Sequence, residues 1–555
     1  MYSNKKNVLE LVSLLKAHGV SQAVLSPGSR NIPIVKSLAA DAFFTCHTVV
    51  DERGAGFYAI GIAQHTGQAV AVCCTSGTAV LNYAPAVAEA FYQELPLIVI
   101  TADRPAAWIG QMAGQTLPQQ GVFGALVKKS FQLPEIMSDE DGWYCNRLVN
   151  EALLETRRHR RGPVHINVPL SEPLFECPEE QLPRARVINR RSPQTVFPAV
   201  YGTSFLRRRR RMIIAGQSAG GEMSAEPDKL IGSHDCVVLA EHISNLPHSR
   251  YIRNFDALLC SIPPGEEAHY APDLLITTGG HIVSKRIRQF LKANPPEEHW
   301  HVSPGGEVAD TFQCLTDVIE AEGRDFIAYL ATLPRPAVST DGYAMRWLSC
   351  SRSLPEPKAV FSDLMAVGRL IKSLPEEANL QLANSSSVRL VQLFSLKGRQ
   401  RVFCNRGTSG IDGCLSTAIG QASVSPGVPT FLIIGDLSFF YDINALWNPL
   451  SNPSQLRILL NNNGGGGIFH TLPGLESSRI TDRHIATSHA AGARVWAEGL
   501  GITYFPVSNE EEFEAYLPTF ISREAAGPML MEVFTSKEKN AAILKNYYSS
   551  LRDSL

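Results

Sequence analysis

The sequence predicts an α/β chain of three doubly wound parallel-sheet domains, and two observations support this fold class. Short apolar runs that end in Gly- or Ser-containing turns alternate with helical stretches along the chain. This alternation is typical of a parallel sheet that is covered by helices on both faces. The length of 555 residues corresponds to three or four domains at about 150 residues each.

The first predicted domain covers residues 1–180. Three strands are expected in it, each followed directly by a turn of small or polar residues: Ala23–Leu25 before Ser26–Arg30, Ala69–Cys74 before Thr75–Thr78, and Leu97–Thr101 before Ala102–Pro105. Ligands of doubly wound sheets bind at the carboxyl ends of the strands. These turns are therefore candidate binding elements.

Two polar, Pro-containing stretches, from Glu179 to about Pro198 and from Pro334 to about Pro357, predict linkers. They delimit a central domain at 195–345 and a last domain at 357–555. The strands expected in the central domain are Met212–Ala215, Cys236–Leu239 and Leu274–Thr277. Those expected in the last domain are Leu380–Ala383, Val402–Cys404, Thr430–Ile434 and Ile458–Leu460.

Composition and charge exclude several classes of function. The formal net charge of −2 indicates no general affinity for nucleic acid or anionic membranes, and Arg207–Arg211 is interpreted as a solvated entry to a strand. No apolar run is long enough to insert into a bilayer. The 11 cysteines form no C-x-x-C pair, which argues against zinc. Their odd number fits a reducing compartment, so we expect a soluble, cytoplasmic protein.

The strongest local signal is a pair of turns in the last domain. Gly435-Asp436-Leu437-Ser438 follows one predicted strand, and the Asn- and Gly-rich segment 461–467 follows the next, with Asp436 and Asn463 27 residues apart. A strand, a crossover helix and a second strand fill that distance, so both turns are expected at one sheet edge. Carboxylate, amide and carbonyl oxygens suit Mg²⁺, and glycines let backbone N–H groups approach a phosphate. The alternative is two ordinary turns of a parallel sheet.

This pair of turns resembles the diphosphate- and metal-binding signature of thiamine-diphosphate enzymes, although Leu437 stands where the signature usually has Gly. The resemblance implies three ligands for Mg²⁺ or Mn²⁺, namely the side chains of Asp436 and Asn463 and the Gly465 carbonyl, with the register of the carbonyl open within residues 464–467. It also implies a distant Glu that hydrogen-bonds the aminopyrimidine ring, and Glu52 before Gly54 and Gly56 fits this role better than Asp51. An exposed acid at a helix start is the alternative. The cofactor-binding residues implied in this way are Glu52, Thr75, Gly77, Ile411, Gly435, Asp436, Leu437, Ser438, Asn463, Gly465 and Ile468.

Several further motifs occur in one order and narrow the resemblance: 26–31 (SPGSRN), 51–56 (DERGAG), 101–105 (TADRP), 405–413 (NRGTSGIDG) and 468–473 (IFHTLP). Together they are similar to the 2-succinyl-5-enolpyruvyl-6-hydroxy-3-cyclohexene-1-carboxylate synthases of menaquinone biosynthesis. That family decarboxylates 2-oxoglutarate and adds the succinyl carbanion equivalent to isochorismate in a 1,4-addition. The resemblance further implies at least a homodimer, or a homotetramer, with sites at the subunit interface.

Both substrates are dicarboxylates, and Arg binds carboxylates in a bidentate way. The resemblance implies five catalytic residues, Glu52, Arg30, Ser385, Arg389 and Arg406. It implies isochorismate contacts from Ser29, Arg30, Arg104, Gln115, Lys285 and Arg286, and 2-oxoglutarate contacts from Ser385, Arg389 and Arg406. Phe469 and Leu472 would form an apolar wall that favours loss of CO₂, and Ile411 would support the bent cofactor. The alternatives are a surface salt bridge for any single Arg and a core position for Ile411.

Two other functions are open at this level. Another thiamine-diphosphate enzyme, such as an acetohydroxyacid synthase or a benzoylformate-type decarboxylase, would share the cofactor residues. The Arg set and the absence of a His-His dipeptide favour carboligation over it. A non-catalytic, metabolite-binding relative is the second alternative, and the presence of Glu52, Asp436 and Asn463 argues against it.

Overall fold

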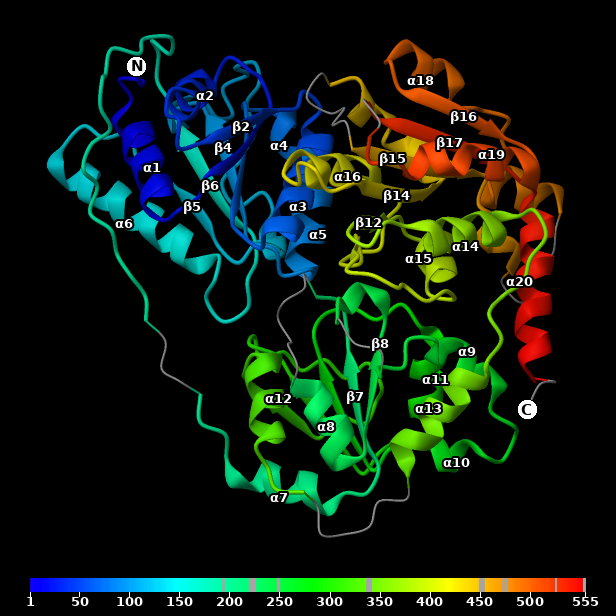
Figure 1. Cartoon of the computed structure of the whole chain (residues 1–555). Helices are drawn as coiled ribbons and strands as arrows, with labels where there is room; N and C mark the ends of the chain where they lie inside the picture. The colour runs from blue at the N-terminus through cyan, green and yellow to red at the C-terminus, as the bar shows by residue number, and fades with distance from the viewer. Residues whose placement is uncertain are drawn as a thin grey trace.

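The computed structural model describes residues 1–191, 195–218, 226–246, 250–335, 342–448, 455–471, 475, 478–524 and 527–552. Its strands form three separate sheets of parallel strands, called here the first, middle and third sheets in chain order. In Figure 1 the first sheet (blue to cyan) and the third sheet (yellow to red) lie side by side above the middle sheet (green). The sequence-based prediction of three doubly wound α/β units is confirmed.

The first sheet has the strand order β2-β1-β3-β4-β6-β5. Its strands are β1 (Gln22–Leu25), β2 (Thr45–Thr48), β3 (Val70–Cys74), β4 (Leu97–Asp103), β5 (Ser130–Gln132) and β6 (Val164–Pro169). One face packs against α1 (Lys6–Ala17), α2 (Ile32–Ala39) and α6 (Asp139–Glu155). The other face packs against α3 (Glu52–Thr66), α4 (Thr78–Asn82) and α5 (Ala84–Tyr92).

The middle sheet has the order β11-β10-β9-β7-β8. Its strands are β7 (Arg211–Ala215), β8 (Cys236–Ala240), β9 (Leu274–Thr278), β10 (Glu298–Val302) and β11 (Asp317–Ile319). The helices α7 (Ala199–Arg207), α8 (Glu226–His234) and α12 (Gly323–Ala331) cover one face. The helices α9 (Phe255–Ser261), α11 (Lys285–Ala293) and α13 (Tyr343–Ser353) cover the other, with the short α10 (Glu267–Tyr270) beside them.

The third sheet, β13-β12-β14-β15-β17-β16, repeats the strand order of the first. Its strands are β12 (Asn379–Leu382), β13 (Arg401–Cys404), β14 (Thr430–Gly435), β15 (Leu456–Asn462), β16 (Thr503–Val507) and β17 (Met529–Phe534). The helices α14 (Asp363–Ser373), α15 (Ser386–Val391), α19 (Glu510–Ile521) and α20 (Lys537–Arg552) cover its outer face. The helices α16 (Cys414–Ser423), α17 (Asp436–Tyr441) and α18 (Arg494–Gly499) lie on the face toward the first sheet.

The first and third sheets share one hydrophobic core, in which α3 crosses α16. The two helices touch through their backbones, because a Cβ at Gly61 would lie 2.0 Å from the Thr417 carbonyl oxygen and one at Gly420 would lie 2.1 Å from the Tyr58 carbonyl oxygen. Only glycine permits this approach. The packing fixes the two sheets relative to each other and thereby positions the turns at their strand ends.

Two expectations about the central region are corrected. The stretch 334–357 is not all linker, because it contains α13, whose Tyr343 and Trp347 are fully buried in the core of the middle sheet. The Arg run is not simply solvated either. Arg211 is buried and donates to the carbonyls of Phe205 and His234, each at 2.6 Å. The run thus joins α7 and α8 to the sheet. The domain bounds stay a prediction.

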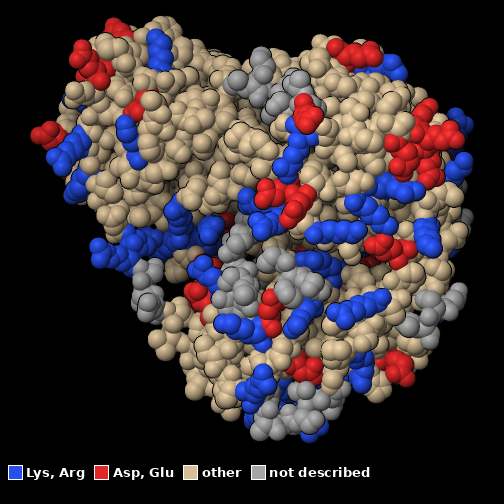
Figure 2. All heavy atoms as spheres, in the orientation of Figure 1, with Lys and Arg blue, Asp and Glu red and all other residues tan. Residues whose placement is uncertain are grey.

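The surface agrees with a mixed charge distribution. Figure 2 shows Lys and Arg side chains next to Asp and Glu side chains on the face drawn, with large neutral areas between them. Within the described residues, none of the helices combines the length and the apolar composition that crossing a membrane requires.

Candidate functional site

Glu52 lines a cavity of about 560 Å³ at the carboxyl ends of β1 and β3. It is the first residue of α3, and the preceding Asp51 caps the helix by accepting from the Arg53 and Gly54 N–H groups. Burial raises the pKa of the Glu52 carboxyl, and the neighbouring Asp51 charge raises it further, while a hydrogen bond with Asn82 acts against the shift. A carboxyl with a raised pKa exchanges protons closer to neutral pH. The position therefore suits the proton-handling role predicted for Glu52.

The floor of this cavity, called here the Glu52 cavity, is a tight backbone turn. Gly77 has a φ of +89°, and its N–H donates to Gln119 Oε1 at 2.9 Å. Gly28 leaves no room for a side chain, since a Cβ there would lie 2.3 Å from Thr75 Cβ. The predicted residues Thr75 and Gly77 are thus brought together with Glu52. Gln119 was missed because nothing in its local sequence indicates a contact 42 residues away.

The predicted isochorismate residues of the first domain gather at the same strand ends. Arg30 is buried, donates from Nη1 to the Leu170 carbonyl at 3.0 Å and pairs with Glu172 at 3.1 Å. Burial and the nearby Arg104 lower the pKa of the Arg30 guanidinium. Arg104 donates from Nε to the Gly114 carbonyl at 3.1 Å. Gln115 lines the Glu52 cavity, and Ser29 is exposed on the adjoining turn.

The second group of predicted residues lies at the carboxyl end of the third sheet. β14 and β15 are parallel neighbours, with Gly435 opposite Asn461. The two turns that follow them meet as the spacing predicted, because the Gly465 N–H donates to Asp436 Oδ2 at 2.9 Å. Asp436 Oδ1 accepts from the Leu437 N–H at 2.7 Å, so a Leu at this position leaves the backbone contact intact. Burial raises the pKa of the Asp436 carboxyl.

The oxygens at this turn fit a hard cation. Asn463 Nδ2 donates to Asp363 Oδ2 at 2.9 Å, while Asn463 Oδ1 is buried without a hydrogen-bond partner. Gly465 has a φ of +143°, and its carbonyl accepts only one short N–H contact, from Gly467 at 2.9 Å, among the backbone pairs of the described chain. A carboxylate, an unsatisfied amide oxygen and a carbonyl at one turn match the ligand preference of Mg²⁺. Asp363 was missed because it lies 100 residues from Asn463.

The predicted cofactor wall joins this turn. Ser438 Oγ donates to the Ile411 carbonyl at 2.5 Å, which ties the 405–413 loop to α17. Ile411 is 41% exposed, so the alternative of a core isoleucine is wrong. Ile468 and Phe469 are half-buried in the short helix η6 (Gly467–Thr471), with the Phe469 ring 2.8 Å from where a Cβ on Gly466 would lie. Leu472 lies outside the described residues.

Arg406 is held in a buried loop by its neighbours. Its Nη1 donates to Asn384 Oδ1 at 3.0 Å, whereas its Nε is buried without a hydrogen-bond partner. Glu89 of the first domain accepts from the Gly407 and Thr408 N–H groups, both at 2.7 Å, and so positions this loop. Ser385 has a φ of +70°, which is strained for a residue with a side chain. The Arg406 guanidinium thus hydrogen-bonds Asn384, which directly precedes Ser385 in the chain.

The remaining cations line a cavity of about 350 Å³ between the middle and third sheets. Lys285 and Arg286 begin α11, and Arg389 projects from α15 and donates to the Val283 carbonyl at 3.3 Å. The structure thus brings Arg286 and Arg389 together from segments about 100 residues apart. This cavity is called here the cationic cavity.

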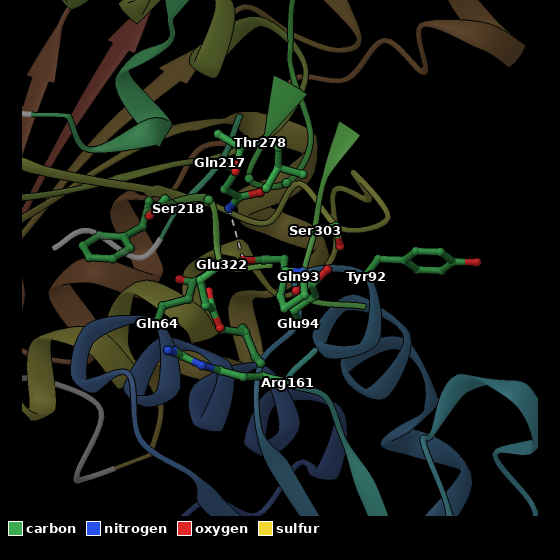
Figure 3. A pocket seen from close by; sticks show the side chains of 17 residues that line it. Gln64, Tyr92, Gln93, Glu94, Arg161, Gln217, Ser218, Thr278, Ser303 and Glu322 are labelled. Carbon is green, nitrogen blue, oxygen red and sulfur yellow. Dashed lines mark hydrogen bonds between the residues drawn. The ribbon is translucent and has the colours of Figure 1, made fainter. Parts of the chain in front are cut away.

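A further cavity lies where all three domains meet, away from the predicted site residues (Figure 3). Its lining includes Gln93 and Arg161 of the first domain and Gln217 and Glu322 of the middle domain, and Gln217 Nε2 donates to Gln93 Oε1 at 3.1 Å. None of the predicted site residues lines it. The chemistry is therefore expected elsewhere.

The described lining of the Glu52 cavity belongs to the first domain alone. All described residues that line the Glu52 cavity fall between Pro27 and Leu117, so none comes from the third domain. Leu81, Ile411 and Tyr441, which lie close to one or other half, are 47%, 41% and 53% exposed. Exposed apolar side chains at incomplete binding sites are typical of surfaces that a second subunit covers.

Comparison with known proteins identifies the protein family to which the chain, with its Glu52 cavity and Asp436 turn, belongs. The chain matches the N-terminal thiamine pyrophosphate binding domain of thiamine pyrophosphate enzymes at residues 9–126, their middle domain at 185–380 and their C-terminal thiamine pyrophosphate binding domain at 384–533. It is 52% identical to the 2-succinyl-5-enolpyruvyl-6-hydroxy-3-cyclohexene-1-carboxylate synthase of Bacteroides thetaiotaomicron and 49% identical to that of Phocaeicola vulgatus, over 100% of each chain. The chain belongs to this family. The synthase of Flavobacterium johnsoniae is 37% identical over 98% of both chains.

Membership in this synthase family confirms the resemblance that the motifs indicated, and with it that the chain is a thiamine-diphosphate-dependent enzyme. Thiamine pyrophosphate is the same compound as thiamine diphosphate. The Glu52 cavity lies in the segment that matches the N-terminal cofactor-binding domain, and the Asp436 turn lies in the segment that matches the C-terminal one. This chain thus has both of the domains that bind the cofactor in thiamine pyrophosphate enzymes.

Proposed function

We propose that the chain is a transferase of menaquinone biosynthesis that decarboxylates 2-oxoglutarate and adds the succinyl group to isochorismate. The product is 2-succinyl-5-enolpyruvyl-6-hydroxy-3-cyclohexene-1-carboxylate. The observation that supports this best is the pairing of a complete cofactor residue set with several cations, Arg30, Arg104, Arg286, Arg389 and Arg406, at strand ends or cavity walls. Two dicarboxylate substrates need such a set, whereas pyruvate, with one carboxylate, does not.

The cofactor's thiazolium ring, when bound, supplies the electron sink for the carbanion that decarboxylation leaves. Asp436, Asn463 and the Gly465 carbonyl would hold Mg²⁺ or Mn²⁺ against its diphosphate. Glu52 would hold a proton between its carboxyl oxygen and the aminopyrimidine ring. Phe469 would contribute, as predicted with Leu472, to an apolar wall beside the reacting carbon. Such a wall disfavours a charged carboxylate and therefore favours the loss of CO₂.

The cationic groups bind and orient the substrates. Arg389 and Arg406, with Ser385, would bind 2-oxoglutarate, and Arg30, Arg104, Lys285 and Arg286 would bind isochorismate with Ser29 and Gln115. The chain has no adjacent His pair to protonate the carbanion early. The acceptor can therefore capture it first.

Incubation with thiamine diphosphate, Mg²⁺, 2-oxoglutarate and isochorismate, followed by mass spectrometry, tests the reaction. The product mass is expected with this substrate pair and not when pyruvate replaces 2-oxoglutarate. A product from pyruvate instead would favour an acetohydroxyacid synthase. No turnover of either oxo acid would favour a non-catalytic relative.

We also propose that the active enzyme is a homodimer, or a homotetramer of such dimers, in which Glu52 of one subunit meets Asp436 of the other. The lining of the Glu52 cavity by residues of the first domain alone supports this. Glu52→Gln and Asp436→Ala subunits, each inactive alone, are mixed one to one after dissociation. If the sites are shared, mixed dimers contain one intact site, and about a quarter of the wild-type activity returns. If each chain holds a complete site, no activity returns.

A further inference from the structure

Arg286 of the cationic cavity makes an ion pair and a cation–π contact with two residues that no sequence motif indicated. Its Nη1 pairs with a carboxylate oxygen of Asp256, from α9. Its Cζ lies 4.1 Å from the ring centroid of Tyr548, from the C-terminal helix α20. Figure 1 shows α20 running from the third domain down beside α9 and α11 of the middle domain. A guanidinium over an aromatic face is a favourable cation–π contact.

Tyr548 and Asp256 are in turn held in place by hydrogen bonds. Tyr548 Oη donates to Asp256 Oδ2 at 3.3 Å, and the Tyr548 carbonyl accepts from Cys260 Sγ at 3.6 Å. Asp256 Oδ1 accepts from Ser284 Oγ at 2.5 Å. The three groups around Arg286 are therefore connected to one another as well as to its guanidinium.

The start of α11, which carries Arg286, is fixed from a third direction. The buried carboxylate of Glu241 accepts from the Val283 N–H at 2.7 Å and the Ser284 N–H at 2.8 Å. Burial raises the pKa of the Glu241 carboxyl to about 7, so the positive charge of the cavity is only partly cancelled near neutral pH.

Part of the guanidinium stays open to the cationic cavity. The side chain of Arg286 is 35% exposed, and within the described chain its hydrogen bonding is through Nη1 to Asp256. Arg286 lines the cationic cavity together with Lys285 and Arg389. A free Arg side chain is flexible. Because the Arg286 guanidinium is already fixed before a carboxylate binds, less conformational entropy is lost on binding.

We infer that Tyr548 and Asp256 are positioning residues for Arg286, and that α20 thereby sets the affinity of the enzyme for a carboxylate of its acceptor substrate. The inference rests on the proposed function, in which that acceptor is isochorismate. Tyr548 lines the cationic cavity beside Arg286, and its proposed effect is exerted through the orientation of the Arg286 guanidinium. This distinguishes it from a residue that only packs α20.

The test is steady-state kinetics of the full-length enzyme loaded with thiamine diphosphate and Mg²⁺, with each substrate varied in turn. Tyr548→Leu removes the ring and is expected to raise the KM for isochorismate about fivefold. The kcat and the KM for 2-oxoglutarate are expected to stay within about twofold, since the carbon chemistry is untouched. Tyr548→Phe keeps the ring and is expected to retain most of the affinity.

Tyr547→Leu is the matched control. Tyr547 neighbours Tyr548 on α20, is also half-buried and donates its hydroxyl to the Pro355 carbonyl at 3.2 Å. Its ring centroid lies 5.5 Å from that of Tyr548, whereas the cation–π contact of Arg286 is with Tyr548. It is expected to leave the KM for isochorismate near the wild-type value. An equal rise in both Leu variants would mean that α20 is merely loosened, and would overturn the inference.

A double-mutant cycle tests the path through Arg286. In an Arg286→Ala background, Tyr548→Leu is expected to have almost no further effect on the KM for isochorismate, because the group it positions is gone. Additive effects, or a rise confined to 2-oxoglutarate, would overturn the inference. If Tyr548→Leu does not fold, as judged by circular dichroism, Tyr548→Phe runs the same cycle with a smaller expected effect. Lack of isochorismate turnover by the wild type would instead overturn the proposed function, and the inference with it.

Discussion

Asn463 Nδ2 donates to Asp363 Oδ2 at 2.9 Å, so a carboxylate 100 residues earlier in the chain decides which way the Asn463 amide faces. The bond holds Nδ2 on Asp363, and Oδ1 is buried without a hydrogen-bond partner. A metal ligand oriented by an outer hydrogen bond is the usual arrangement of a protein metal site.

Asp363→Ala is expected to lower the affinity for Mg²⁺ in the presence of thiamine diphosphate by about 10-fold, because the Asn463 amide is then free to turn. Titration calorimetry measures this. Asp436→Ala, which removes a proposed ligand outright, is expected to lower the affinity further. Thr535→Val is the control, since Thr535 Oγ1 donates to the other Asp363 oxygen at 2.6 Å and does not touch Asn463. Unchanged affinity in Asp363→Ala would contradict the proposed orientation.

Glu52→Gln is expected to lower kcat by about 100-fold or more while the fold stays intact, because the amide cannot exchange the proton that the carboxyl holds. The measurement is product formation at saturating 2-oxoglutarate and isochorismate. Circular dichroism and the binding of thiamine diphosphate are expected to match the wild type. Substantial residual turnover would remove Glu52 from its proposed role.

Asp442→Asn is expected to flatten the dependence of stability on pH. Burial raises the pKa of Asp442 from 3.8 to about 7, and the carboxylate accepts from the Ser416 N–H at 2.7 Å and from its hydroxyl at 2.9 Å. The folded state thus keeps the proton to higher pH than the unfolded state. The stabilisation that comes from protonated Asp442 in the folded state is fully present below about pH 4, and it is lost as the pH rises through 7. An amide can keep both contacts with Ser416 and does not titrate.

Thermal unfolding between pH 5 and pH 8 checks this expectation. The wild-type Tm is expected to fall more over this range than the Tm of Asp442→Asn. Parallel curves for the two proteins would show that Asp442 does not titrate in the folded state as assigned.

Gly61→Ala is expected to destabilise the chain by about 1–3 kcal/mol, because the new methyl group would overlap the Thr417 carbonyl oxygen where α3 crosses α16. Thermal unfolding measures the loss. Gly499→Ala is the matched control, since a Cβ at that position on α18 meets nothing within 4 Å. Equal Tm values for the two variants would contradict the close helix crossing.

Most of the strongly apolar strands were predicted, although β17 was missed, and the weakly apolar strands were not predicted. β2 and β16 lie at sheet edges and bury few of their residues, so their sequences show little pattern. β6 is fully buried but contains His165 and Asn167. Their polar groups are satisfied by Thr101, whose hydroxyl lies 2.8 Å from His165 Nε2 and 2.7 Å from Asn167 Oδ1. A buried strand is hard to recognise from its sequence when it contains polar residues whose hydrogen-bond partners lie on another strand.

By itself, the sequence determined the fold class, the family and the chemistry-bearing turns. A strand that ends in Gly-Asp or Thr-Ser-Gly is a local pattern, and parallel strands bring their carboxyl ends to one edge. Only the tertiary structure decided how those side chains are held. Asp363 orients Asn463, Glu89 positions the Arg406 loop, and Tyr548 grips Arg286. Each of these contacts joins segments that are about 100 to more than 300 residues apart. No local pattern of residues specifies such a contact, because packing alone brings the two segments together.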